Sequence, residues 1–93
     1  MIRTFSSSET ERLFKRERVV EFVNIERVAL RRLVALDNAI ALTDLRIPPE
    51  NSLEALKGDR AGQHSIRIND QYRICFTWKE DGAYGVEITK HYD

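Results

Sequence analysis

The sequence predicts an α+β fold in which two N-terminal helices pack on a small, curved, mainly antiparallel sheet. Two observations support this prediction in the two halves of the chain. Apolar residues recur at three- and four-residue spacing in the first half, which is typical of amphipathic helices. They alternate with polar residues in the second half, which is typical of strands with one buried face. A third observation, the dipeptide Asp81-Gly82 between two alternating runs, indicates an antiparallel hairpin.

Composition limits the class of protein. A chain of 93 residues buries one core but not two, so residues 1–93 are predicted to form a single domain. Basic and acidic residues number 15 each, so nucleic acid would have to be bound by a local cationic patch. The one cysteine, Cys75, fits a reducing compartment and is interpreted as a small strand residue, not a nucleophile. No apolar run is long enough for a membrane span or a signal peptide, which favours a cytoplasmic location.

The chain begins with a predicted short strand over residues 2–5, where apolar and polar residues alternate. A run of serines then precedes a helix predicted over residues 8–16, and acidic residues in its first turn favour a helix N-terminus there. Its buried side is expected to consist of Leu13 and Phe14.

A longer helix is predicted from Ile25 to about Leu42, with Asn24 as its N-cap. Its apolar stripe is predicted to comprise Ile25, Val28, Ala29, Leu33, Leu36 and Ile40. Three arginines stand away from most of this stripe: Arg27, Arg31 and Arg32. Such a row is either a solvated face or a basic ridge that contacts RNA or an acidic segment of a protein partner, and both interpretations stay open.

Residues 43–52 contain two consecutive prolines and are predicted to form a loop that is non-helical from about Arg46. Strands are then predicted over residues 53–56, 63–69, 72–79 and 83–89, with turns at 69–71 and 80–82.

Alternation divides the central strands into two faces. The core face is predicted to hold Ile66, Ile68, Ile74, Phe76 and Trp78. The polar face is predicted to hold Arg67, Asn69, Arg73, Cys75 and Thr77. Arg67, Asn69 and Arg73 should therefore lie close together on a surface that suits phosphate, and Arg73 should be removable with almost no effect on folding. His64 falls on the core side and is expected to be a core-edge residue, not a catalyst.

Two motifs in this region resemble a known family. The run 56–62 reads Leu-Lys-Gly-Asp-Arg-Ala-Gly, and the run 65–74 reads Ser-Ile-Arg-Ile-Asn-Asp-Gln-Tyr-Arg-Ile. Both resemble HigB-type toxins of the RelE/ParE superfamily, and the similarity extends from residues 2–5 to residues 86–88. The resemblance implies a bacterial endoribonuclease that cleaves mRNA on the ribosome and is encoded beside its antitoxin.

The resemblance also implies site residues. The family's active-site Lys of the first motif and the Arg after the Asn-x-x-aromatic turn match Lys57 and Arg73. A further family arginine falls on Asn69, with Arg67 two residues earlier on the same face. Many of these toxins end in Asp-Tyr-His, whereas this chain has Lys90-His91-Tyr92. The implied catalytic residues are Lys57, Arg67, Arg73, His91 and Tyr92. The implied RNA-binding residues are Arg60, Asn69, Arg27, Arg31 and Lys90.

RNA cleavage through the 2′-hydroxyl needs a proton acceptor, a proton donor and cations that stabilise the phosphorane. A histidine side chain ordinarily changes its charge near neutral pH, so His91 is a candidate for one of the proton-transfer roles. No residues have metal-ligand spacing, so a metal-independent reaction without cofactors is expected. The implied partners are a HigA-type antitoxin, through which the complex binds operator DNA, together with the ribosome and mRNA. Two alternatives stay open: a ParE-like gyrase inhibitor and a catalytically inactive antitoxin-binding module.

Overall fold

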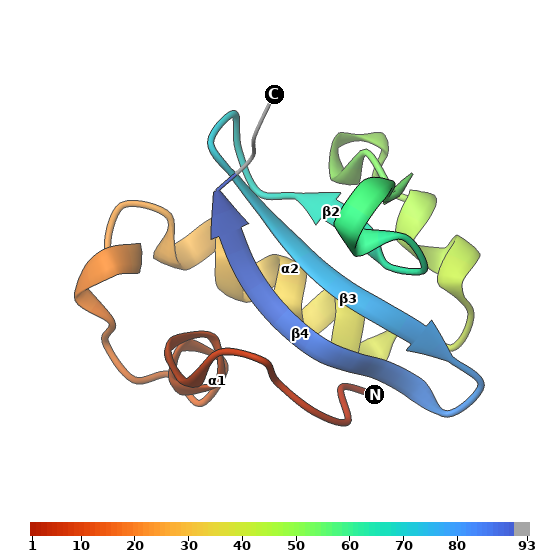
Figure 1. The fold of residues 1–93 in the computed structure, drawn as a ribbon. Coiled ribbons are helices and arrows are strands. Elements are labelled where there is room, and N and C mark those ends of the chain that lie inside the picture. The colour runs from red at the N-terminus through yellow and green to blue at the C-terminus, as the bar shows by residue number, and fades with distance from the viewer. Residues whose placement is uncertain (91–93) are drawn as a thin grey trace.

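The computed structural model describes residues 1–90. Two helices precede the sheet strands in the chain (Figure 1), and the elements are α1 Ser8–Phe14, α2 Glu26–Asn38, β1 Glu54–Ala55, β2 His64–Arg67, β3 Tyr72–Lys79 and β4 Gly82–Lys90. Short 3₁₀ turns lie in the connections, at Val20–Phe22, Leu42–Arg46, Pro49–Asn51 and Gly58–Arg60. The α+β class predicted from the sequence is confirmed.

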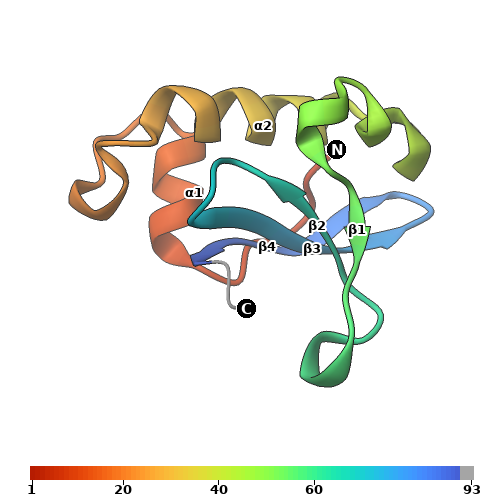
Figure 2. The ribbon, with the colours of Figure 1, turned by 90° about the horizontal axis from the view of Figure 1, so that it is seen from above.

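The strands form one antiparallel sheet in the order β1-β2-β3-β4. The N-terminal residues run parallel to β4, through bridges from Ile2 to Ala83 and from Phe5 to Val86, so the sheet is mainly antiparallel as predicted. β3 matches its predicted range of 72–79, whereas β1 and β2 are shorter than predicted. Figure 2 shows α2 on one side of the sheet and the segment that follows β1 projecting on the other side.

The core lies between α2 and the sheet. The helix buries Ala29, Leu33 and Leu36 completely, each with 0% exposure. The strands bury a matching set against them, Ile66, Ile74, Phe76, Val86 and Ile88, and Ile68 in the turn after β2 joins this set. Burial of each large side chain contributes about 1.5–3 kcal/mol, so this layer determines which sheet face is covered. Within residues 1–90, no helix has the length and apolar character that a membrane crossing requires.

The predicted bounds of the longer helix were wrong at both ends. It is preceded by Ile25, which makes no side-chain capping bond, and not by Asn24. It ends at Asn38 and not near Leu42. Ile40, assigned to the buried stripe from its spacing, is 89% exposed.

A carboxylate accounts for the early end of α2. Asp44 Oδ2 accepts the backbone N–H groups of Ile40 at 2.9 Å and Ala41 at 3.0 Å, and the chain turns there into a 3₁₀ segment. Both bonds lower the pKa of Asp44, because they favour the charged carboxylate, and the bond from Ala41 has the larger effect. The Asp44 side chain thus takes the two N–H groups that backbone carbonyl oxygens would accept if the helix continued.

The first helix is also shorter than the predicted range 8–16. It stops at Phe14, and Arg16 then takes a left-handed backbone conformation with φ of 67°. Ser7 is the N-cap, and its Oγ accepts the backbone N–H of Thr10 at 3.1 Å.

Candidate active site

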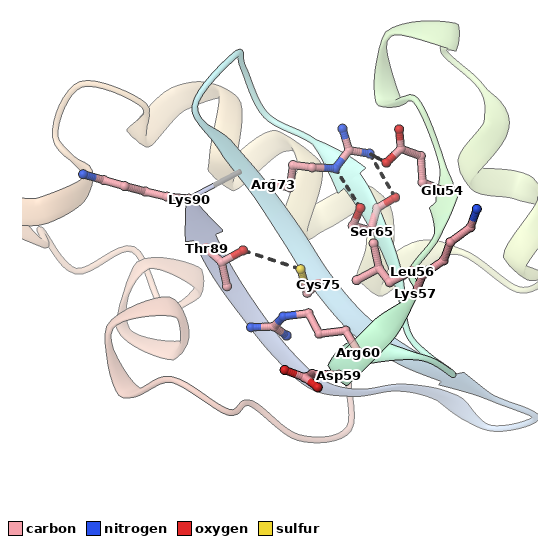
Figure 3. A pocket seen from close by; sticks show the side chains of 10 residues that line it. All are labelled: Glu54, Leu56, Lys57, Asp59, Arg60, Ser65, Arg73, Cys75, Thr89 and Lys90. Atoms are coloured by element: carbon pink, nitrogen blue, oxygen red, sulfur yellow. Dashed lines mark hydrogen bonds and ion pairs between the residues drawn. The ribbon is translucent and has the colours of Figure 1, made fainter. Parts of the chain in front are cut away.

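A pocket of about 410 Å³ lies beside β1, on the face of the sheet opposite α2 (Figure 3). Its walls come from all four strands and from the 3₁₀ turn after β1. The lining residues are Glu54, Leu56, Lys57, Asp59, Arg60, Ser65, Arg73, Cys75, Thr89 and Lys90. Because α2 covers only the opposite face, the exposed members of this set, Glu54, Lys57, Asp59 and Lys90, are open to a ligand, whereas Ser65, Arg73 and Cys75 are buried in the wall.

The strand register brings this set together. Ser65 of β2 lies opposite Glu54 on one side and Cys75 on the other, so the three side chains share a face. Arg73 pairs with Thr89 in the same way. Alternation therefore placed Arg73 and Cys75 correctly on the polar face, away from the core.

Arg73 is nevertheless buried, with 7% exposure. Its Nε donates to Ser65 Oγ at 2.7 Å, and its Nη2 donates to the carbonyl oxygen of Ser52 at 2.5 Å. The same Nη2 lies 3.6 Å from Oε2 of Glu54. A buried charge needs such partners, and losing them destabilises a fold. We therefore expect Arg73 to contribute to folding stability, in contrast to the expectation from strand alternation, because the side chain is not exposed as that expectation assumed.

The other cations of the pocket are more exposed. Lys57 and Lys90 are exposed residues, and Figure 3 shows them extending from opposite sides of the pocket. Arg60 donates to Gln63 Oε1 at 3.0 Å and to Glu87 Oε1 at 2.9 Å, which ties the turn after β1 to β4. With four cations against two carboxylates in its lining, the pocket is locally positive in a chain of zero net charge.

Comparison with known proteins identifies the family. The protein-family model described as "RelE-like toxin of type II toxin-antitoxin system HigB" matches residues 3–91. The chain belongs to this family. It is 43% identical over 77 residues to Toxin HigB-1 of Vibrio cholerae serotype O1, covering 83% of this chain and 80% of that protein. It is also 31% identical over 68 residues to an uncharacterized protein of Haemophilus influenzae, covering 73% and 67% respectively.

A solved structure supports the fold. A chain of the YoeB-YefM complex from Staphylococcus aureus superposes with a TM-score of 0.62 at 18% identity, covering 99% of both chains. This HigB-family protein is thus a toxin of a type II toxin-antitoxin system, and the partner of such a toxin is an antitoxin. The activity known for the family is ribosome-dependent cleavage of mRNA.

The structure does not bring every predicted site residue of this toxin into the pocket. Arg67 lies opposite Arg73 in the register, but its guanidinium pairs with Asp70 in the following turn. Asn69 Oδ1 accepts the backbone N–H groups of residues 71 and 72, at 2.9 and 2.8 Å, and so closes that turn. Neither residue lines the pocket.

The arginine row on α2 is separate from the pocket. Arg27 and Arg31 are exposed on the helix, which covers the other face of the sheet. Arg32 is half-buried and donates through Nε to the carbonyl oxygen of Arg67 at 3.1 Å. Burial, and then the charges of Arg31 and Arg67, lower the pKa of Arg32.

Two predicted catalytic residues, His91 and Tyr92, lie outside the described residues. His64 stacks on Phe76 at 6.4 Å between ring centroids, on the core side as predicted. No three His, Cys, Asp or Glu side chains gather as a possible metal site anywhere in residues 1–90.

Sequence reasoning missed three groups that hold or surround Arg73. Ser65 is two residues from Arg67 on the same strand, so alternation contained the signal for it. No sequence pattern indicated Glu54, because a strand of two residues is too short to show alternation. Ser52 contributes a backbone carbonyl, which no side-chain pattern reveals.

Proposed function

We propose that this toxin is an endoribonuclease that cleaves mRNA on the ribosome, and that the pocket beside β1 binds the scissile phosphate. The observation that supports this best is the guanidinium of Arg73, which is held in the pocket wall by Ser65 and Ser52. A fixed, permanently charged fork suits the developing charge of a phosphorane. The family's known activity agrees with this assignment.

The remaining lining residues suggest a division of roles. Lys57 and Lys90 attract the RNA backbone, and Arg60 adds charge on the turn after β1. Glu54 and Asp59 are the carboxylates in the lining and are candidates to take the 2′-hydroxyl proton. His91 and Tyr92 follow Lys90 directly in the sequence, and we retain them as candidates for proton transfer and base stacking on the strength of the resemblance.

Net charge favours a ribosome-bound substrate. A chain with 15 basic and 15 acidic residues binds free RNA weakly, so the ribosome would supply most of the positioning. Naked RNA should accordingly be cut poorly. We propose the cytoplasm as the place of action, a HigA-type antitoxin as the partner, and binding of the complex to operator DNA through that antitoxin.

The proposed reaction uses side chains and no metal ion. The products should then carry 2′,3′-cyclic phosphate or 3′-phosphate ends, because the 2′-oxygen is the nucleophile. End analysis of the cleaved mRNA tests this directly, and 3′-hydroxyl ends would contradict the mechanism.

Primer extension on translated mRNA after expression of the toxin tests the function as a whole. We expect cleavage of mRNA on ribosomes from the native toxin and roughly hundredfold less from Arg73→Ala, the scale of losing one transition-state donor. Intact mRNA would contradict the proposed function, and a parallel DNA supercoiling assay would then separate a gyrase inhibitor from an inactive antitoxin-binding module.

A further inference from the structure

We propose that Ser65 is a positioning residue, whose hydroxyl fixes the orientation of the Arg73 guanidinium in the pocket wall and so the direction of the N–H donors that it offers to the substrate phosphate. This role rests on the function proposed above. It adds a residue of β2 that lies outside the matched Lys and Arg positions.

The contacts of Arg73 lie on one edge of its guanidinium. Nε donates to Ser65 Oγ at 2.7 Å. Nη2 donates to the carbonyl oxygens of Ser52 at 2.5 Å and Ser65 at 3.4 Å, and it faces Glu54 at 3.6 Å. Within residues 1–90, Nη1 takes part in none of these bonds, and in Figure 3 it is the guanidinium nitrogen that no dashed line joins.

Geometry explains why Ser65 is needed. Arg73 lies directly opposite Arg67, so its side chain must lean diagonally along β2 to reach the serine. A guanidinium is planar, and bonds at both Nε and Nη2 fix its rotation and therefore the direction of Nη1. Ser65 has 0% exposure, so water does not compete for this bond. A donor fixed before the substrate arrives needs no reorganisation during the reaction.

Without the hydroxyl, one of these constraints is lost. The guanidinium then keeps its bond to Ser52 and is free to turn toward the carboxylate of Glu54. Such a turn changes the direction of Nη1 and therefore the donor that the substrate phosphate meets. The binding of RNA should change little, because Lys57 and Lys90 are unaffected, whereas the rate of the chemical step should fall.

The test is a double-mutant cycle in single-turnover cleavage on programmed ribosomes. Ser65→Ala should lower the rate constant roughly tenfold, the scale of one hydrogen bond to a charged group, with little change in apparent KM. In an Arg73→Ala background the same change should have no further effect, because a positioning residue acts only through its partner. Ser65→Thr retains the oxygen and should recover most of the rate.

A matched control separates positioning from general stability. Thr10 of α1 is also buried, with 0% exposure, and its Oγ1 accepts the backbone N–H of Ile88 at 3.0 Å. Thr10→Val deletes that hydroxyl and should destabilise the fold while the cleavage rate stays native. Equal rates for Ser65→Ala and native toxin, or equal losses in both backgrounds, would overturn the positioning role. If Ser65→Ala does not fold, Ser65→Cys replaces it in the cycle, since sulfur is a weak acceptor.

A measurement without cleavage tests the same bond. The Nε–H resonance of Arg73, assigned by its loss in Arg73→Lys, should be protected from solvent exchange in the native toxin and should exchange at least tenfold faster in Ser65→Ala. Identical exchange in the two proteins would overturn the role of Ser65. Native toxin that leaves ribosome-bound mRNA intact would contradict the proposed function instead, and the exchange rates would still decide the position of the guanidinium.

Discussion

Replacement of Arg73 should reduce folding stability as well as activity. Arg73→Ala removes the N–H groups that donate to Ser65 Oγ and to the carbonyl oxygen of Ser52, and it removes the ion pair with Glu54. Hydrogen bonds to a charged group contribute about 1.5–3 kcal/mol each, and the relief from burying the charge offsets part of that sum. We expect a loss of roughly 3 kcal/mol in the free energy of unfolding, which lowers Tm by about 12–24 °C in a domain of this size.

Arg67→Ala is the matched control. This arginine lies opposite Arg73 on the same face, and its partner Asp70 is 94% exposed at the side chain. A surface pair of this kind contributes about 0–1 kcal/mol. Urea unfolding at 25 °C, followed by circular dichroism, measures both variants, and the total of about 5–15 kcal/mol typical of a domain leaves Arg73→Ala folded for cleavage assays. Equal midpoints for the two variants would refute the structural role assigned to Arg73.

Three further predictions concern the pocket rim, a hairpin glycine and a carboxylate. Lys57→Ala should slow cleavage on programmed ribosomes, whereas Lys79→Ala, whose amine lies over the Tyr84 ring at the far hairpin, should cleave at the native rate. Gly82→Ala should destabilise the fold by roughly 1–3 kcal/mol or more in urea unfolding, since φ is 141° and a Cβ would lie 2.1 Å from the carbonyl oxygen of residue 1. The lowered pKa of Asp44 means that it stabilises the fold above its unfolded pKa of about 3.9 and loses that effect as the pH falls through its lower folded pKa. Asp44→Asn should therefore flatten the acid limb of stability against pH, and parallel limbs for the two proteins would contradict this.

Sequence periodicity determined the class of fold and the face of each strand. Apolar spacing placed Leu33 and Leu36 in the core, and alternation placed Arg73 and Cys75 on the opposite face. These inferences hold because side-chain direction follows from local backbone geometry, which repeats along each element. The motifs in residues 56–74 likewise sufficed to indicate the family, which the comparisons confirmed.

Only the tertiary structure decided which partner each polar group binds and how deeply it is buried. Ile40 has the spacing of a buried helix residue, but the carboxylate of Asp44 captures its backbone N–H and ends the helix before it. Arg67 and Arg73 have equivalent places in the strand pattern, yet one pairs with an exposed turn residue and the other is buried against Ser65. The contacts of Ile40 and Arg67 are local, but apolar spacing and strand alternation do not indicate which nearby carboxylate takes part in them. The burial of Arg73 depends on acceptors that β2 and the segment before β1 bring to it, and no local pattern in the sequence carries that information.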